Sequence, residues 1–510
     1  MSTLTDSRSG DSRAGGHYAM RVAAGDQVAV ALEDLQAGQS VSAGGVTLTL
    51  RDDVPRGHKF ALIPIAAGEA VSKYGFRIGT ASADIAPGQH VHSHNLRTAL
   101  EGLEDYVYAP DAPARGEGAT GTFQGYRRGW GRSGGGVGIR NEIWILCTVG
   151  CVARTAQRLA KEAHERFKGR VDGVYAITHP LGCSQLGDDL GHTRDVLAAL
   201  ASHPNAGAAL IVGLGCENNQ LSELIKRIDR PEDRLAWFAA QKVDDELEAG
   251  MNALEKLVAV IENDRRETCD VSDLVIGVKC GGSDAFSGLT ANPVVGRVAD
   301  KVAFAGGKAI LSEIPEIFGA ERILMARARD QATFQSVVDV VNDFKTYFIE
   351  HKQPVFENPS PGNKAGGLTT LEEKSLGAVQ KGGTSPLNGV LRYGERVRES
   401  GLSLLEAPGN DAVSSTALTA AGAVIVLFTT GRGTPLGFPA PTLKIASNSV
   451  LAAHKPHWID FDAGVVLDAG VDGAADALMD KILSVASGAP TRNEINDERE
   501  IAIWKNGVTL

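Results

Sequence analysis

The sequence predicts an α/β protein of several domains, in which a small β domain is followed by two α/β units with largely parallel sheets. Three observations support this fold class. Residues 17–97 contain short apolar runs separated by Gly, Asp and Pro, which is typical of strands joined by tight turns. Residues 121–267 alternate apolar runs with amphipathic segments, as repeated strand–helix units do. Residues 268–510 resume this alternation after a charged boundary segment.

The remaining segments and the composition narrow the class of protein. Residues 1–16 are rich in Ser, Gly and Arg and lack an apolar core, so we expect a disordered head rather than a secretory signal. Residues 98–120 are expected to form an exposed linker. The 510 residues carry 62 acidic and 51 basic side chains, a net charge of −11, which argues against nucleic acid or an anionic membrane as a partner. No apolar run approaches a membrane-spanning length, and we expect a cytoplasmic protein with reduced cysteines.

Four of the six cysteines lie where predicted strands end. Cys151, Cys183 and Cys216 follow successive strands of the first α/β unit, and Cys280 follows the apolar run at 274–279. Parallel strands end at one edge of a sheet, so the first three cysteines are predicted to be neighbours in space. Thiolate ligands and small buried apolar residues are both compatible with this pattern.

Two polar loops in the last unit have the character of ligand-binding segments. Residues 280–293 form a glycine-rich elbow between a buried strand and a helix, where open α/β sheets bind their ligands. Residues 357–368 form a long irregular stretch without the charge density of a disordered linker, so we interpret it as a substrate loop. We expect the polar elbows of the chain to converge on one site.

Three histidines alternate along a short segment of the β domain. In an extended strand His90, His92 and His94 would lie on the same face. Three imidazoles on one face suit a divalent metal, although a solvated, histidine-rich edge strand would give the same pattern. A quarter of the 12 histidines fall within five positions, which favours contact with metal or substrate.

Elimination of water from a hydroxy acid accounts for this inventory of side chains. The reaction requires a base, a cationic group or metal that holds the carboxylate, and an acid for the departing hydroxyl. The acid–base candidates are His58, Lys59, His179 and Glu217. The candidates for binding a polyhydroxylated acid are Asn218, Ser283, Asp284, Asn363, Lys364, Asn410, Asp411 and Arg432, with Arg127, Arg128 and Arg140 as a further anion clamp.

Structural roles compete with these assignments. His179 precedes a proline and would also suit a turn at a strand end, and Glu217 would also suit a cap of the following helix. Asp284 and Asp411 would likewise serve as caps. From the residues alone the chain is a multidomain α/β enzyme with a polar, metal-compatible site, or a sugar-acid binding protein without catalysis. A nicotinamide dehydrogenase is disfavoured because no glycine fingerprint follows a strand.

Several long strings resemble the altronate and galactarate dehydratase family over nearly the whole chain after the head. The strings at 56–62 and 73–75 resemble the family's N-terminal SAF domain, a β-clip fold. Strings shared by both branches of the family are 213–217, 280–288, 358–364 and 430–434. Segments similar to the altronate branch include 90–95, 183–189, 216–220 and 457–464. The loop at 130–136 departs from the family pattern by being longer and richer in glycine.

The resemblance implies conversion of D-altronate to 2-dehydro-3-deoxy-D-gluconate plus water, in hexuronate catabolism. A related sugar acid such as galactarate is the alternative substrate, and homo-oligomer formation is left open. The resemblance also implies dependence on Fe²⁺, with Mn²⁺ as a substitute, and leaves the ligands undecided. One set is His90, His92 and His94 on a β domain that closes as a lid over the α/β site. The other is Cys151, Cys183, Cys216 and Cys280, which would suit an iron–sulfur cluster; we favour a single labile ion.

Overall fold

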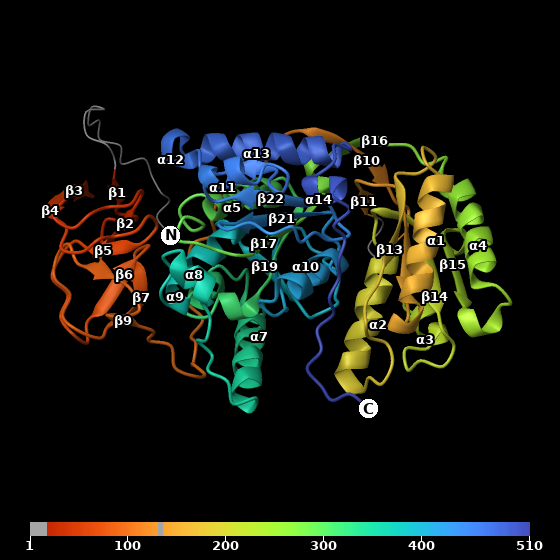
Figure 1. Cartoon of the computed structure of the whole chain (residues 1–510), viewed down its shortest axis with the longest axis horizontal. Helices are drawn as coiled ribbons and strands as arrows, with labels where there is room; N and C mark the ends of the chain where they lie inside the picture. Colours follow the sequence, from red (N-terminus) through yellow and green to blue (C-terminus); the bar gives the residue numbers. More distant parts are fainter. Residues whose placement is uncertain (1–17, 131–135) are drawn as a thin grey trace.

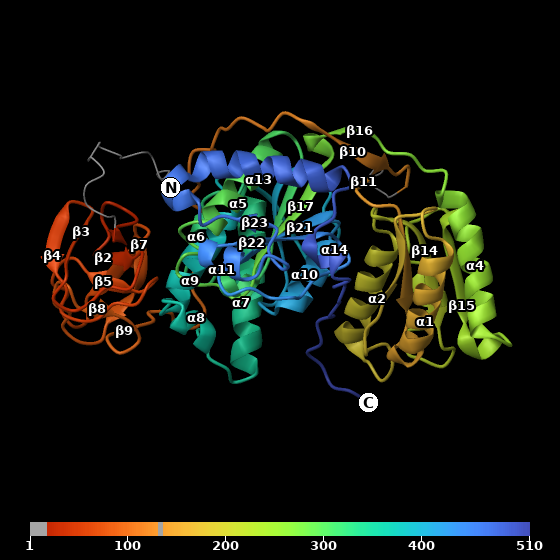
Figure 2. The same cartoon turned by 45° about the horizontal axis from the view of Figure 1, so that its top comes forward.

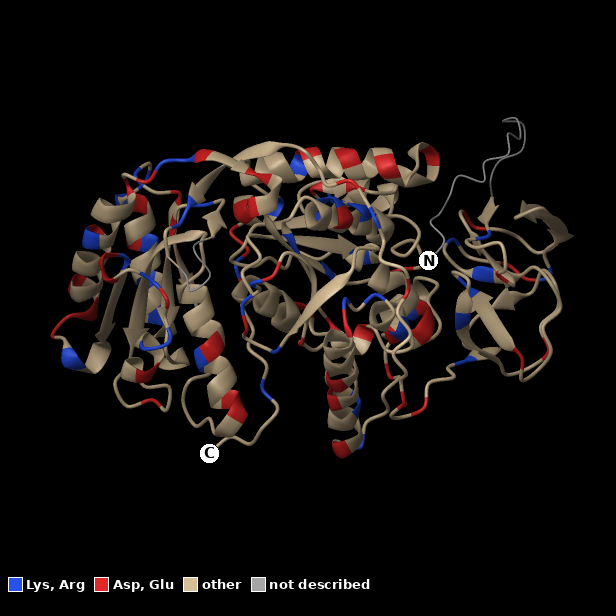
Figure 3. Cartoon of the chain, turned by 180° about the vertical axis from the view of Figure 1, so that it is seen from behind, with Lys and Arg blue, Asp and Glu red and all other residues tan. Residues whose placement is uncertain are grey.

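The computed structural model describes residues 18–130 and 136–510, which form three bodies in a row (Figures 1 and 2). The β domain lies at one end, the first α/β domain at the other, and the C-terminal α/β domain between them. The predicted fold class is therefore confirmed. The predicted disordered head and most of the loop at 130–136 lie outside the described residues. Acidic and basic side chains are interspersed over all three bodies (Figure 3), and no described helix is long and apolar enough to cross a membrane.

The N-terminal domain consists of short antiparallel strands around a small apolar core. One sheet has the order β1-β2-β5-β8, a second β6-β7-β9, and a third is the β3–β4 hairpin. Apolar side chains of this domain, such as Ile78 and Val91, belong to a buried cluster that continues to Leu371 and Leu376 of the C-terminal domain. The strands are β1 (Ala19–Met20), β2 (Val28–Ala31), β3 (Ser40–Ala43), β4 (Val46–Thr49), β5 (Lys59–Ala61), β6 (Ala70–Lys73), β7 (Phe76–Ala81), β8 (His90–Val91) and β9 (Leu96–Arg97).

The first α/β domain is a parallel four-stranded sheet covered on both faces. Its order is β13-β12-β14-β15, with β12 (Glu142–Cys147), β13 (Gly173–Ile177), β14 (Ala206–Gly213) and β15 (Leu235–Ala239). Ile143 and Ile145 pack against α1 (Ala153–Arg166) and α4 (Glu246–Ile261). Trp144 and Leu146 point to the other face, toward α2 (Gly187–Ala201) and the C-terminal domain. A short helix, α3 (Leu221–Ile225), follows β14.

The C-terminal domain is built on a seven-stranded parallel sheet of order β19-β20-β18-β17-β21-β22-β23. The chain extends to one side of β17 and later returns to its other side, so a topological switch point lies beside this strand. The strands are β17 (Val275–Cys280), β18 (Lys308–Leu311), β19 (Leu387–Leu391), β20 (Gly401–Leu405), β21 (Ile425–Thr430), β22 (Thr442–Ala446) and β23 (Phe461–Asp462). The helices are α5 (Ala291–Phe304), α6 (Glu321–Met325), α7 (Gln331–Glu350), α8 (Pro361–Ala365), α9 (Leu371–Ala378), α10 (Asp411–Ala420), α11 (Ser449–His454), α12 (Val466–Ala469), α13 (Val471–Ala486) and α14 (Arg492–Ile495).

Two connecting regions differ from simple linkers. The segment at 98–120 contains no helix or strand, as expected, but it lies against the C-terminal domain, where the Tyr106 hydroxyl donates to Glu321 Oε1 at 2.5 Å. The first α/β domain is entered and left through an antiparallel strand pair, β10 (Thr122–Arg127) with β16 (Glu267–Asp270). The short strand β11 (Val137–Gly138) pairs with β10 on its other side.

Candidate active site between the β domain and the C-terminal sheet

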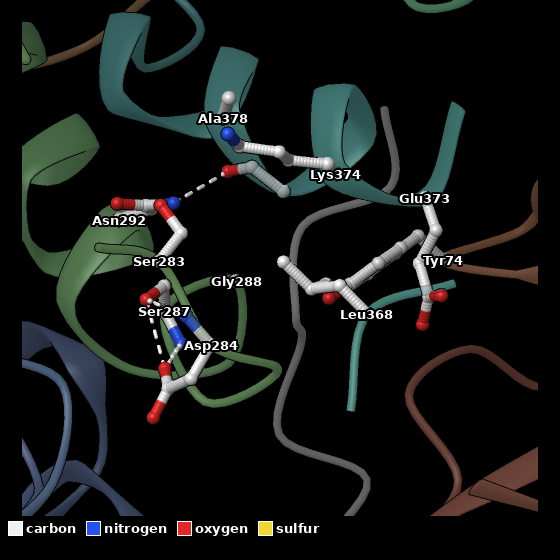
Figure 4. Close-up of a pocket in the computed structure, with 11 residues that line it drawn as sticks. Tyr74, Ser283, Asp284, Ser287, Gly288, Asn292, Leu368, Glu373, Lys374 and Ala378 are labelled. Atoms are coloured by element: carbon white, nitrogen blue, oxygen red, sulfur yellow. Dashed lines mark hydrogen bonds between the residues drawn. The ribbon is translucent and has the colours of Figure 1, made fainter. Parts of the chain in front are cut away.

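The elbow after β17 meets α9 and the β domain at a small polar pocket (Figure 4). The elbow lies at the switch point of the sheet. Glycines there let neighbouring segments approach closely, because a Cβ on Gly431 would lie 2.2 Å from Asp284 Cγ. Figure 4 shows Ser283, Asp284 and Asn292 on one side and Lys374 on another. The pocket is lined by Tyr74, Ser283, Asp284, Ser287, Gly288, Asn292, Leu368, Glu373, Lys374, Gly377 and Ala378.

A buried ion-pair cluster attaches the β domain to α9. Glu373 accepts from the Lys59 ammonium at 2.8 Å and from the Lys73 ammonium at 2.9 Å, with all three side chains at most 1% exposed. Burial opposes ionisation of this carboxyl, but the two ammonium groups outweigh it and hold the pKa of Glu373 at about 2. Burial lowers the pKa of Lys59. Lys59 also donates to Thr369 Oγ1 at 2.5 Å and Gly367 O at 3.3 Å, so its three protons are all used.

Four histidines of the β domain cluster where it faces α8. His58, His90 and His92 have ring centroids 5.0 to 5.6 Å apart, and the His94 ring lies 5.5 Å from that of His90. His58 Nδ1 and His90 Nε2 share a hydrogen bond at 3.0 Å. We call this group the histidine face; it contains the three histidines predicted from alternation and adds His58, which was predicted as an acid–base residue.

The histidine face is held against the predicted substrate loop. His92 Nε2 lies 3.0 Å from the carbonyl oxygen of Lys364, and His58 Nε2 lies 3.4 Å from that of Ala365. Burial and nearby positive charge lower the pKa of His90 and His92 to about 4, so both rings are neutral near pH 7. Neutral imidazoles carry the lone pair that a divalent metal requires.

Charged residues surround Cys280, and of these only Asp411 was predicted from the sequence. The Lys279 ammonium donates to Glu313 at 2.7 Å and Asp411 at 2.9 Å, and that of Lys374 donates to Glu316 at 2.7 Å. Burial and Glu313 raise the pKa of the Cys280 thiol to about 12. Among the described residues, Cys280, Glu313 and Glu316 form the single group with closely spaced metal-ligating atoms. Lysines already neutralise these carboxylates and the thiol is protonated, so we interpret the group as a charge-paired network.

Several predicted substrate-binding residues are occupied with structural hydrogen bonds. Asp284 accepts from Ser287 and Ser447 within and beside its elbow, at 2.9 and 2.8 Å. Asn363 belongs to the cap of α8, and its amide donates to Ser283 O at 2.7 Å. Asn410 caps α10, as its side chain accepts from two amides of the first turn. Asp411 is the ion-pair partner of Lys279. The irregular stretch at 357–368 thus contains a short helix, because Ser360 and Asn363 form a capping box.

The remaining predicted groups lie at the mouth of this region. The side chain of Ser283 lines the pocket. Arg432 is exposed and donates to Gly362 O at 3.0 Å, which brings its guanidinium to α8. Lys364 is half-buried on α8, and its ammonium has no hydrogen bond or ion pair with any residue that the structure describes. Lys364 is therefore available to a ligand, Arg432 has guanidinium nitrogens besides the one bonded to Gly362 O, and Ser283 is 4% exposed inside the pocket.

The predicted residues of the first α/β domain lie elsewhere. His179 Nε2 lies 2.9 Å from Cys147 O and its Nδ1 accepts from Leu181 N at 3.1 Å, so the backbone engages both nitrogens. Glu217 accepts from Thr148 Oγ1 and from two amides of its own loop, Leu214 N at 3.0 Å and Gly215 N at 2.6 Å. The catalytic roles of His179 and Glu217 stay predictions, and their contacts favour structural roles.

The expectation that all polar elbows converge on one site is wrong. Cys151, Cys183 and Cys216 are exposed at the carboxyl edge of the first α/β sheet, and Asn218 Oδ1 accepts from Ser184 N there at 2.8 Å. Cys280 is buried in the C-terminal domain, so the four cysteines do not form one ligand set. The proposed anion clamp is also divided: Arg127 pairs with Glu267 and Asp273, Arg128 with Asp264, and Arg140 with Glu494. The two α/β sheets have separate ligand edges because they belong to separate domains.

Comparison with known proteins identifies the family of this chain. Three family models match in succession: the altronate/galactarate dehydratase SAF domain over residues 17–99, the D-galactarate dehydratase/altronate hydrolase second domain over 129–262, and the D-galactarate/altronate dehydratase C-terminal domain over 271–509. The fold is thus that of a sugar-acid dehydratase. The chain belongs to the D-galactarate/altronate dehydratase family.

Individual relatives cover nearly the whole chain. An altronate dehydratase of Escherichia coli (strain K12) is 53% identical over 96% of this chain and 99% of its own length. An altronate dehydratase of Bacillus subtilis (strain 168) is 48% identical over 95% of this chain and 98% of its own length. A galactarate dehydratase (L-threo-forming) of Escherichia coli (strain K12) is 32% identical over 91% of both chains. The similarity is therefore greater to the altronate branch than to this galactarate enzyme.

Proposed function

We propose that this protein is an altronate dehydratase, a hydro-lyase that converts D-altronate to 2-dehydro-3-deoxy-D-gluconate and water. The observation that carries the proposal is the near full-length identity of 53% and 48% to two altronate dehydratases, against 32% to a galactarate dehydratase. The polar site between the β domain and the C-terminal sheet supports the same activity.

The residues at the mouth of the site suit the two ends of a sugar acid. Lys364 and Arg432 supply positive charge on and beside α8, where a carboxylate would be bound. Ser283 in the pocket carries a hydroxyl group for hydrogen bonding to the polyol chain. The pocket has a volume of about 10 Å³, so it admits a sugar acid only when the β domain opens away from the C-terminal domain. Behind these residues, the Lys374 ammonium is held by Glu316, Asn358 and Asn363, which fixes a cation at the floor of the site. Proton removal next to a carboxylate is favoured by such fixed positive charge, because negative charge accumulates there in the transition state.

We further propose that the histidine face holds the Fe²⁺ or Mn²⁺ that the family resemblance implies. His58, His90 and His92 have adjacent rings, and two of them are neutral near pH 7, which supports this donor set. Their ring nitrogens do not all lie within 4.8 Å of one another, so binding requires the rings to rotate toward the ion. A divalent ion bound there would supply Lewis-acid stabilisation of a substrate oxygen. The rings lie beside the carbonyl oxygens of Lys364 and Ala365, close to the proposed carboxylate-binding residues, and this proximity supports the proposal.

A direct assay tests the activity. The chain is purified under anaerobic conditions, supplied with Fe²⁺ and incubated with D-altronate, and 2-keto acid formation is measured, with D-galactarate and D-gluconate in parallel. We expect product from D-altronate at a rate at least tenfold above the other acids, a margin of about 1.4 kcal/mol in transition-state binding. Product mainly from galactarate would move the chain to the other branch. No product from any of the three would favour a sugar-acid binding protein without catalysis.

A further inference from the structure

Three Gly-Cys dipeptides end three neighbouring strands of the first α/β domain, and the proposed dehydratase site does not use them. Gly150-Cys151 follows β12, Gly182-Cys183 follows β13, and Gly215-Cys216 follows β14. These strands are adjacent and parallel, in the order β13-β12-β14. The other three cysteines of the chain do not follow a glycine. We call the three loops that carry Cys151, Cys183 and Cys216 the cysteine edge.

Direct hydrogen bonds hold these three loops together. Gly150 N donates to Leu181 O at 2.9 Å, which joins the first two loops. Asn219 N donates to Gly182 O at 3.0 Å and Ser184 N donates to Asn218 Oδ1 at 2.8 Å, which joins the second and third loops. The first and third loops are joined by Asn219 Nδ2, which donates to Thr148 O at 2.9 Å. Each cysteine therefore stands in a loop bonded to both of the others.

Glycine is required next to the cysteines by close packing and backbone conformation. A Cβ on Gly182 would lie 2.1 Å from Thr148 O, and one on Gly150 would lie 3.0 Å from Pro180 Cα. Gly182 and Gly215 have φ values of +103° and +131°, which side chains rarely adopt. The glycines let the loops approach one another, which fixes the backbone of the three cysteines. The three sulfur atoms do not all lie within 4.8 Å of one another, so a shared metal requires the exposed side chains to rotate toward it.

The exposure of the three thiols is unusual for free cysteines. Cys151, Cys183 and Cys216 are exposed, whereas Cys147, Cys269 and Cys280 are buried. A free cysteine is ordinarily among the most buried residue types, since it packs as a small apolar side chain. Exposure of all three thiols on bonded loops indicates a role other than packing.

Two helices direct their N-termini to the same edge. The helices α1 and α2 have 14 and 15 residues, and neither has a side chain that caps its first turn. The helix dipoles favour negative charge at this edge, where α2 already carries Asp188 and Asp189 in its first turn.

We propose that Cys151, Cys183 and Cys216 form a three-thiolate site for a thiophilic metal, bound as a single ion or as an iron–sulfur cluster. Thiolates are the ligands that zinc, ferrous iron and iron–sulfur clusters prefer, and three of them leave one coordination position open to a water or an oxygen ligand. Cys280 cannot be the fourth ligand, because it is buried in the C-terminal domain beside Glu313 and Glu316. This site is separate from the histidine face and does not depend on the proposed altronate dehydratase activity.

Cobalt is the probe for the thiolates. Co²⁺ is titrated anaerobically into the full-length, reduced and metal-depleted chain, and thiolate-to-cobalt charge-transfer absorption is recorded in the near ultraviolet. We expect the band in the wild-type chain, in Cys269→Ser and in His92→Ala. In the Cys151→Ser, Cys183→Ser, Cys216→Ser triple variant, which has lost all three thiolates, we expect the band to be absent. A band of full intensity in the triple variant would overturn the proposal.

A second measurement uses the unaltered chain, so it does not depend on the folding of a variant. The wild-type protein is alkylated with iodoacetamide with and without Co²⁺, and each cysteine is quantified by mass spectrometry. Protection of Cys151, Cys183 and Cys216 together supports the site. Equal labelling of the three with and without Co²⁺ refutes it.

Reconstitution with Fe²⁺ and sulfide then distinguishes the two forms of the site. A cluster is indicated if the wild-type chain binds iron and an equal amount of acid-labile sulfide and the triple variant binds neither. A single ion is indicated if the wild-type chain binds iron without sulfide. Iron binding that is the same in the triple variant argues against both. The D-altronate assay on the same samples distinguishes the two proposals. A chain that is inactive but retains the thiolate band contradicts the dehydratase proposal and not the thiolate site.

Discussion

The histidine face and the cysteine edge are both rich in metal-ligating groups, yet they are assembled in different ways. The histidine face forms between two domains, because imidazoles of the β domain meet carbonyl oxygens of residues 364 and 365. The cysteine edge forms within one domain, from loops that follow adjacent strands of a single sheet. In Figure 1 the domains that carry them lie at opposite ends of the molecule.

This difference predicts how each region responds to mutation of the contact between domains. A site between domains persists only while the contact between them persists, and here that contact depends on Glu373 with its two lysines. The site at the edge of the first α/β sheet depends on that domain and on the C-terminal elements packed against it, and not on the contact with the β domain. Perturbations of the interface should therefore affect the histidine face and leave the cysteine edge intact. The following predictions test this separation, beginning with the largest effect.

Removing the charge of Glu373 should have the largest effect. Glu373→Gln leaves Lys59 and Lys73 buried without their counter-ion, and we expect a loss of about 3–5 kcal/mol in the free energy of unfolding. Denaturant unfolding measures the loss, and limited proteolysis should release the β domain. Alkylation rates of Cys151, Cys183 and Cys216 should not change. Glu262→Gln, which removes an exposed pair with Arg170, is the control and should have no measurable effect. Faster alkylation in Glu373→Gln would show that the two regions are coupled.

Acid should weaken the same contact. The pKa of Glu373 is about 2 in the folded protein and about 4.3 in an unfolded chain, so its ionisation stabilises the fold above pH ~4.3. That stabilisation, up to about 3 kcal/mol, is lost as the pH falls from about 4 to 2. Unfolding of the wild type and of Glu373→Gln at pH 5 and pH 3 measures it. A difference between the two proteins that does not shrink toward pH 3 would contradict the assignment.

Removing one imidazole should deplete the proposed metal of the histidine face. For His92→Ala we expect bound iron, measured by elemental analysis after anaerobic purification, to fall ~10-fold, with D-altronate turnover reduced ~100-fold. His454→Ala, an exposed histidine at the end of α11, is the matched control. Unchanged iron content in His92→Ala would show that the metal binds at another site, and the cysteine edge would then be tested.

Lys364 should affect substrate binding more than chemistry. Lys364→Ala removes the unpaired ammonium on α8, and we expect KM for D-altronate to rise ~10-fold with kcat within ~3-fold. Steady-state kinetics measure both. Lys226→Ala removes an exposed lysine of the first α/β domain and serves as the control. A fall in kcat with unchanged KM would instead place Lys364 in the chemical step.

The smallest catalytic effect is expected at Glu217. Its carboxylate is held by Thr148 and two amides, so Glu217→Gln should lower the free energy of unfolding by about 1–2 kcal/mol and leave kcat within ~2-fold. Steady-state kinetics and denaturant unfolding check both values. A 100-fold loss of kcat would move the active site from the interface to the cysteine edge.

Local patterns predicted the fold well because strands and helices leave periodic traces in sequence. The run at 274–279 predicted β17, and the polar elbow after it does lie at the switch point of a parallel sheet. Alternation predicted His90 and His92 on one face of an extended strand. Their rings are 5.6 Å apart, but β8 ends at Val91 and a turn follows, so the extended segment was wrong. The family resemblance, confirmed by the comparisons, supplied the activity that patterns alone left open.

The rest of the site depends on contacts between residues far apart in the chain. Nothing near Lys59 or Lys73 in the sequence indicates Glu373, which is about 300 positions away. His58 joins the histidine face only because β5 pairs with β8. Glu313 and Glu316 follow a strand, which was a usable signal, but their lysine partners come from β17 and α9. Sequence periodicity does not show which distant segments pair or how domains pack together. It therefore did not show that the two α/β sheets have separate ligand edges.

The antiparallel pair of β10 and β16 has a consequence for how this protein can be engineered. Thr122 lies opposite Asp270 and Gly125 lies opposite Glu267, so the chain leaves for the first α/β domain and returns from it at neighbouring points. Paired strands are about 5 Å apart, a gap that a two-residue turn closes. The whole domain is thus topologically an insertion, and a shortened chain in which a turn joins β10 to β16 keeps the connectivity of the other two domains. Excision would give the histidine face and the cysteine edge as two separate polypeptides.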